Sequence, residues 1–162
     1  MVSFPDYDTP IGREIAGALG GQREYGADVM QLLYIANRYE WKPEIARALA
    51  AGEVVLCDRY VASSVAYGEA QGLDPGWLTE IQKFLPPPDL TILLDIVPET
   101  AVGRKATGRD RYERDLSLLG RVGASYHRQA EQPGWLRLDG ERPAAVVAVD
   151  VISAVSTRFA LP

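Results

Sequence analysis

The sequence predicts an α/β fold, with a parallel sheet and flanking helices. Continuous apolar runs at 54–57 and 90–96 are typical of strands buried on both faces, and a third strand is predicted at 135–138. Helical periodicity lies between these runs, and strands that alternate with helices indicate parallel pairing. The chain has 162 residues, so we expect a single domain over 1–162.

Capping residues mark most of the predicted helices. Thr9 and Pro10 indicate the N-cap and first residue of a helix that ends at Gly20. Apolar residues at a spacing of 3–4 predict a helix over 27–40, after which Pro43 starts a separate helix that stops at Gly52. Further helices are predicted over 63–72, from Asp74-Pro75 to Phe84, from Pro98, over 116–131 and from Pro143.

Composition excludes several classes of protein. With 17 Lys and Arg against 22 Asp and Glu, the net charge is −5, which argues against a duplex nucleic-acid binder. Apolar runs are too short to span a membrane, and the first residues do not resemble a signal peptide. Cys57 is the only cysteine, which excludes an intramolecular disulfide. We therefore expect a cytoplasmic protein that binds neither nucleic acid nor membranes.

Charged and hydroxyl side chains follow the first apolar run. Asp58 and Arg59 leave the carboxyl end of this predicted strand, where α/β sheets bind ligands. The carboxylate is suited to a metal-bound water and the guanidinium to a phosphate, although a structural ion pair is the alternative. Ser63, Ser64 and Tyr67 come next and either line the same cleft or, in the case of the serines, cap the helix.

Two other groups of residues are suited to a nucleotide. Tyr34 and Arg38 lie four residues apart on one helix face, where they can stack on and hydrogen-bond a planar base; a surface Tyr–Arg stack is the alternative. The segment 104–114 is rich in cations and is either a lid that closes over phosphates or a solvated, self-paired loop. Its cations are Arg104, Lys105, Arg109, Arg111 and Arg114.

Three familiar motifs are absent from the sequence. No lysine follows a glycine, so the phosphate-binding loop G-x-x-x-x-G-K-[ST] is not present. No two glycines are spaced as G-x-G, which excludes the dinucleotide fingerprint. His127 is the only histidine, and without a G-x-S-x-G elbow it does not indicate a serine hydrolase.

Taken in order, these segments resemble the thymidylate kinase family, whose members phosphorylate dTMP with ATP. The resemblance covers nearly the whole chain. It is carried by Phe4-Pro5 with Thr9-Pro10-Ile11-Gly12, by the helix segment 32–40, by Asp58-Arg59-Tyr60 with Ser63-Ser64, by Pro88-Asp89-Leu90 through Asp95, and by Arg109-Asp110-Arg111-Tyr112-Glu113.

The resemblance implies a role for each candidate residue. It implies that Tyr34 stacks on thymine and that Arg38 donates a hydrogen bond to it. It implies that Arg59 holds the dTMP phosphate and that Asp58 lies near Mg²⁺, the cofactor expected with ATP. The remaining implied site residues are Phe4 and Pro5 near the thymine methyl, Tyr67 against a ribose 2′-hydroxyl, and Arg104, Arg109 and Arg111 in the lid. Ser63 and Ser64 are expected to bind substrate because of their position after the strand.

The family also implies a fold, and this chain departs from it. We expect the parallel sheet of a P-loop nucleoside monophosphate kinase, in a homodimer, but without the family's first strand, P-loop and first helix. That first strand would lie between the strands at 54–57 and 90–96, which should leave two unpaired strand edges. We therefore expect the carboxyl-terminal part of a longer kinase, inactive until the P-loop is restored. The alternatives are a non-catalytic nucleotide-binding or interaction protein and a kinase of another nucleoside monophosphate.

Overall fold

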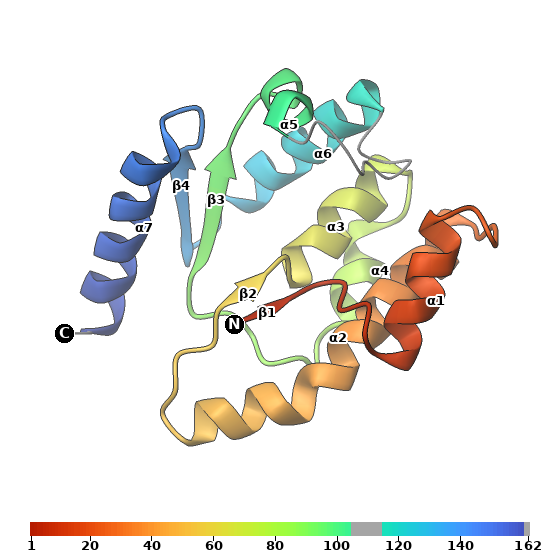
Figure 1. The fold of residues 1–162 in the computed structure, drawn as a ribbon, viewed down its shortest axis with the longest axis horizontal. Coiled ribbons are helices and arrows are strands. Elements are labelled where there is room, and N and C mark those ends of the chain that lie inside the picture. The colour runs from red at the N-terminus through yellow and green to blue at the C-terminus, as the bar shows by residue number, and fades with distance from the viewer. Residues whose placement is uncertain (105–114, 161–162) are drawn as a thin grey trace.

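The computed structural model describes residues 1–104 and 115–160 (Figure 1). The expected lid beyond Arg104, with Lys105, Arg109, Arg111 and Arg114, lies outside the described residues. The elements are β1 (Val2–Ser3), α1 (Pro10–Leu19), α2 (Ala27–Ala50), β2 (Cys57–Asp58), α3 (Val61–Ala70), α4 (Pro75–Glu80), β3 (Thr91–Asp95), α5 (Pro98–Arg104), α6 (Leu116–Gln129), β4 (Trp135–Asp139) and α7 (Ala144–Phe159).

The strands pair in parallel, which confirms the predicted α/β class. β1 pairs with β2, placing Val2 opposite Cys57, and β3 pairs with β4 from Thr91 opposite Trp135 onward. The two pairs form separate sheets, and no ladder joins β2 to β3 within the described parts of the chain. This separation agrees with the expectation that two strand edges lack a partner.

The prediction that these strands are buried on both faces is wrong. Val54 and Leu56 are 54% and 55% exposed and precede β2, which begins only at Cys57. Leu94 in β3 is 48% exposed. An interior strand needs neighbours on both edges and cover on both faces, whereas β2 and β3 each have one neighbour among the described strands.

α2 is one continuous helix of 24 residues, so the prediction of a new helix at Pro43 is wrong. A proline inside a helix removes one backbone hydrogen bond and usually disfavours continuation. Here the residues beyond it are held by packing, because Ile45 is buried in a cluster with Val2 and Phe4. The packing of Ile45 against Val2 and Phe4 therefore outweighs the tendency of Pro43 to end a helix.

The other helices begin close to the predicted positions. Thr9 Oγ1 accepts a hydrogen bond from the Gly12 N–H at 3.0 Å, and Asp74 caps α4 in the same way through the Trp77 N–H. α4 ends at Glu80, short of the predicted Phe84. None of the described helices combines the length and the apolar character needed to cross a bilayer.

Helix packing fixes the position of α3, which lies at the centre of the molecule in Figure 1. Ala66 and Ala70 of α3 pack on Leu118 and Val122 of α6. On another side, Val65 packs with Ile35 of α2 and Leu78 of α4.

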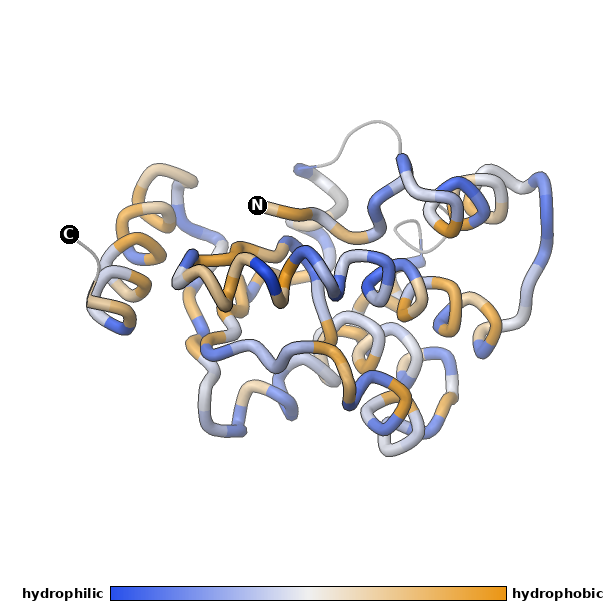
Figure 2. The backbone as a smooth tube through the Cα atoms, turned by 90° about the horizontal axis from the view of Figure 1, so that it is seen from below, coloured by the Kyte–Doolittle hydropathy of each residue, from blue (hydrophilic) through white to orange (hydrophobic). Residues whose placement is uncertain are grey.

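α7, next to the C-terminus, is mostly apolar along its length in Figure 2. Val147 is buried, whereas Val149 and Ile152 are each 64% exposed. The described elements therefore cover only one side of this helix.

The loop after β1 approaches helix α1 closely at Gly12, and a substitution at this position tests that approach. A Cβ at this position would lie 1.7 Å from the Asp6 carbonyl oxygen. We expect Gly12→Ala to displace residues 5–7 and to destabilise the fold by at least about 2 kcal/mol, as overpacking does. Gly120→Ala is the matched control, because its Cβ would meet nothing within 4 Å in helix α6. That variant should gain up to about 1 kcal/mol in urea unfolding, and equal effects at both sites would contradict the tight approach.

Candidate functional site

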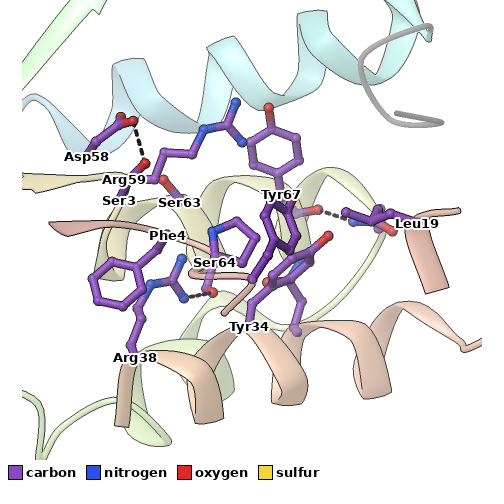
Figure 3. Close-up of a pocket in the computed structure, with 14 residues that line it drawn as sticks. Ser3, Phe4, Leu19, Tyr34, Arg38, Asp58, Arg59, Ser63, Ser64 and Tyr67 are labelled. Atoms are coloured by element: carbon purple, nitrogen blue, oxygen red, sulfur yellow. Dashed lines mark hydrogen bonds between the residues drawn. The ribbon is translucent and has the colours of Figure 1, made fainter. Parts of the chain in front are cut away.

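A cavity of about 440 Å³ opens beside the ends of β1 and β2, between α2 and α3 (Figure 3). It brings together most of the residues that the sequence singled out. Those are Phe4, Pro5, Tyr34, Arg38, Asp58, Arg59, Ser63, Ser64 and Tyr67. Residues far apart in the chain thus form one site, as expected where parallel strands end.

Arg38 is the most deeply buried cation of the site, at 3% exposure. Its Nη1 donates to Ser64 Oγ at 2.6 Å, and its guanidinium lies 5.8 Å from the centre of the Phe4 ring. Burial lowers its pKa to about 10, so the side chain remains charged at neutral pH. Its Nε has no hydrogen-bond partner among the described residues, which leaves a donor for a ligand.

Tyr34 lies one helical turn before Arg38 and lines the same cavity. Its ring also packs against the cluster of Ile15, Ala18 and Met30 between α1 and α2. Because Arg38 is buried, the alternative of a solvent-exposed Tyr–Arg stack is wrong. The pair instead presents a ring and a guanidinium to the interior of the cavity.

Asp58 and Arg59 form the exposed mouth of the cavity. Asp58 Oδ2 accepts a hydrogen bond from Ser3 Oγ at 2.8 Å across the β1–β2 pair. Arg59 has a φ of 60°, in the left-handed region that costs a non-glycine residue about 1–3 kcal/mol. This backbone places its guanidinium 5.6 Å from the centre of the Tyr67 ring. Such strain commonly occurs at functional sites, where it holds a side chain in place.

Ser63 and Ser64 do not cap α3, so that alternative is also wrong. Tyr60 is the N-cap residue, and no side chain caps the helix. Ser64 instead accepts from Arg38, and Ser63 Oγ accepts from the Tyr126 hydroxyl at 2.8 Å. Burial raises the pKa of Tyr126, so its hydroxyl stays protonated and can donate. Both serines therefore lie on the side of α3 that lines the cavity.

Arg104 lies elsewhere, on α5. Its Nη2 donates to the backbone oxygen of Glu141 at 3.4 Å, and it does not line the cavity. The structure does not bring it to the other predicted site residues.

Several cavity residues were missed by the sequence analysis: Ser3, Tyr7, Leu19, Gln31 and Gln71. For Gln31 a signal was present, because it precedes Tyr34 by three residues and Arg38 by seven. Residues at this spacing share one helix face. Ser3 lies in the two-residue strand β1, and Tyr7, Leu19 and Gln71 come from a loop and from helix ends, so none of them belongs to a segment long enough to give a periodic signal.

These features define an α/β protein with a pocket suited to a nucleotide. The thymidylate kinase family model matches residues 1–151, and the chain belongs to that family. A probable thymidylate kinase of Pyrobaculum calidifontis is 36% identical over 93% of this chain and 79% of its own length. The enzyme of Thermomicrobium roseum is 38% identical over 91% of this chain and 76% of its own. A solved thymidylate kinase from Candida albicans superposes with a TM-score of 0.81 at 27% identity, covering 98% of this chain and 80% of that one.

Glu69 ties α3, which carries the serines and Tyr67, to α6. Its carboxylate accepts from Ser125 Oγ at 2.5 Å and from Arg128 Nη2 at 2.6 Å. The hydrogen bond from Ser125 is the main reason that the pKa of Glu69 is lowered, with Arg128 adding to it.

A lowered pKa predicts how stability depends on pH. As the pH falls, Glu69 is protonated in the unfolded chain before it is protonated in the folded protein. The stabilisation that the ionised carboxylate gives the folded protein is therefore complete above the ordinary Glu pKa. It is lost as the pH falls through the lower pKa of the folded state. We expect wild type to be more stable than Glu69→Gln at pH 7, with the gap closing towards pH 3. Urea unfolding of both proteins between pH 7 and pH 3 measures this difference in the free energy of unfolding. A gap that stays constant with pH would show that the carboxylate does not act through its charge.

Proposed function

We propose that the cavity is the nucleoside monophosphate site of a dTMP kinase. In the reaction, a phosphate oxygen of dTMP bonds to the γ-phosphorus of ATP, the bond to the β-phosphate oxygen breaks, and dTDP and ADP form. The observation that carries the proposal is the buried, charged Arg38, with an unpartnered Nε, one turn from the Tyr34 ring in the same cavity.

The base-binding role follows from the chemistry of this pair. Arg38 can only donate hydrogen bonds, so it selects a base with a carbonyl at that position. Tyr34 offers a ring for stacking, and Phe4 and Pro5 provide an apolar wall suited to the thymine methyl. Tyr67 lines the cavity between the base residues and the mouth, where its ring would crowd a ribose 2′-hydroxyl.

The phosphate-binding role belongs to the mouth. Arg59 is exposed there and can hold the dTMP phosphate. Asp58 fits a role beside Mg²⁺, because this ion binds through one or two carboxylates together with waters and substrate phosphates. When bound with ATP, Mg²⁺ would neutralise charge on the transferring phosphate. No group of three or more His, Cys, Asp or Glu within the described residues forms a metal cage of its own.

Phosphoryl transfer also requires a cradle for the ATP phosphates. The 162 residues contain no Gly-Lys pair and therefore no such loop. We propose that catalysis needs a phosphate loop that these residues do not supply.

The absence of this loop from the sequence favours a second candidate, a nucleotide-binding protein without kinase activity. A kinase of another pyrimidine monophosphate is a third, because one methyl group discriminates by only about 1–3 kcal/mol.

Family membership also supports a homodimer. Val29 and Leu32 are exposed apolar residues on α2, at 38% and 45%, and would suit an interface between two copies.

Substitution at Tyr34 and Arg38 tests the base site. Tyr34→Ala should weaken dTMP binding by about 1–3 kcal/mol through lost stacking. Arg38→Met keeps the volume, removes a buried charge and should cost a similar amount. The two losses should not add, because both residues contact one base. Calorimetric titration of dTMP measures this, together with thermal unfolding.

Arg47→Met is the matched control for Arg38→Met. Arg47 lies on the same helix, exposed and paired with Glu44. The Arg47→Met variant should bind dTMP with the same affinity as wild type. If Tyr34→Ala and Arg38→Met also bind normally, both residues serve the scaffold and the base site is wrong.

The missing phosphate loop predicts the outcome of an activity assay. The chain of 162 residues, incubated with ATP, Mg²⁺ and dTMP, should form no dTDP above background, because its sequence contains no G-x-x-x-x-G-K-[ST] loop to hold the ATP phosphates. Chromatography of the nucleotides measures this. Robust turnover would mean that other residues replace the loop.

A further inference from the structure

We infer that Gln31 is an additional specificity residue, whose side-chain amide reads the hydrogen-bonding edge of the bound pyrimidine. The inference rests on the proposed function, because it requires a base in the cavity. It adds a residue that neither motif nor family resemblance singled out.

The side-chain amide of Gln31 is buried and makes no hydrogen bond among the described residues. It is 1% exposed, and both Oε1 and Nε2 lack a partner. It lines the same cavity as Tyr34 and Arg38. Buried amides in folded proteins are nearly always paired, so an amide with both atoms unpaired beside a cavity indicates a partner that enters the cavity.

Asn37, on the same helix, shows the contrast. It is fully buried, and its amide makes hydrogen bonds to Asp6, Thr9 and Glu40 at distances of 2.8–3.1 Å. α2 therefore carries one buried amide that is completely paired and holds the loop after β1. Gln31, two turns earlier, has no such structural task.

Close packing holds the stem of Gln31 in place. α3 approaches α2 at Gly68, where an added Cβ would lie 3.3 Å from Gln31 Cγ and 2.4 Å from Leu78 Cδ1. A glycine at this position lets the two helices meet. The stem of Gln31 is thus confined between them, and the residue is 1% exposed.

The chemistry of Gln31 complements that of Arg38. The edge of thymine carries two carbonyl oxygens and one N–H between them, so it needs an acceptor as well as donors. Arg38 supplies donors only, whereas an amide supplies one acceptor and two donor hydrogens. Gln31 Oε1 can accept from the base N–H while Nε2 donates to a carbonyl. A neutral amide matches the uncharged edge of the base, and we do not expect it to contribute to binding of the phosphate.

The test replaces Gln31 by methionine, which keeps an unbranched stem and removes both hydrogen-bonding atoms. Gln31→Leu serves as a second variant if the first does not fold. Binding of dTMP and of 2-deoxyribose 5-phosphate, which lacks the base, is measured by calorimetric titration, together with thermal unfolding. Gln82→Met is the matched control: Gln82 is 2% exposed with an unpartnered Oε1, but it lies outside the cavity.

We expect Gln31→Met to bind dTMP about tenfold more weakly, as for one or two neutral hydrogen bonds. Its binding of the base-free sugar phosphate should equal that of wild type, and its melting temperature should be equal or higher, because an unpaired buried amide has been removed. Gln82→Met should bind dTMP normally and melt lower, since Gln82 Nε2 donates to the Leu78 carbonyl oxygen at 2.8 Å.

Two results would overturn the inference, and they differ from each other. If wild type binds dTMP and Gln31→Met binds it equally well, Gln31 does not read the base, and the proposed function stands. If wild type binds dTMP no better than the base-free sugar phosphate, the cavity holds no base. The proposed function then fails together with the role of Gln31.

Discussion

A buried positive charge, for which the described residues show no ion pair with a carboxylate, organises the site of this molecule. Placing the Arg38 guanidinium out of water is costly unless other groups compensate. Here Ser64 accepts one hydrogen bond, and the Phe4 ring lies under the charge. These partners belong to α3 and to the end of β1, so a single side chain on α2 joins the elements that form the cavity. The compensation is incomplete, since burial lowers the pKa to about 10 and Nε lacks a partner in the described structure. A ligand carbonyl would complete it.

α2 supports this arrangement from two faces. Its cavity face carries Gln31, Tyr34 and Arg38, whereas the face with Asn37 and Trp41 holds the loop that follows β1. Asn37 binds the backbone of Asp6 through both amide atoms, and Trp41 Nε1 donates to Asp6 Oδ2 at 2.8 Å. These contacts fix the segment that includes Phe4 and Pro5, the apolar wall of the cavity. All of these α2 residues lie in the part of the helix that precedes Pro43, so one helical segment presents both faces.

The second strand pair is tied to the helices by charge. Asp95, at the end of β3, accepts from His127 of α6 at 2.7 Å and from Arg137 Nε of β4 at 2.8 Å. Partial burial raises the pKa of Asp95, but these hydrogen bonds outweigh it and the net shift is downward. α6 therefore contacts both β3 and, through Glu69, the helix that carries the site serines. Within residues 1–104 and 115–160, the two strand pairs are coupled through helices, and no ladder joins them.

Local features of the sequence determined much of the fold and several features of the site. Caps at Thr9 and Asp74 act within a few residues of themselves, so their helices begin where predicted. The spacing of Tyr34 and Arg38 placed both on one helix face for the same reason. The strand-end position of Asp58 and Arg59 followed from the general geometry of parallel sheets.

Only the tertiary structure decided the rest, because it depends on contacts between residues far apart in the chain. Packing of Ile45 against Val2 and Phe4 carried α2 past Pro43. Leu56, which precedes β2, and Leu94 in β3 are both exposed, which the apolar sequence of these segments could not reveal. Ser64 became a partner of Arg38 rather than a helix cap. Whether a buried polar side chain is paired is likewise a property of its surroundings: Asn37 and Gln31 lie on one helix, and among the described residues the fold gives hydrogen-bond partners to the first side chain and none to the second.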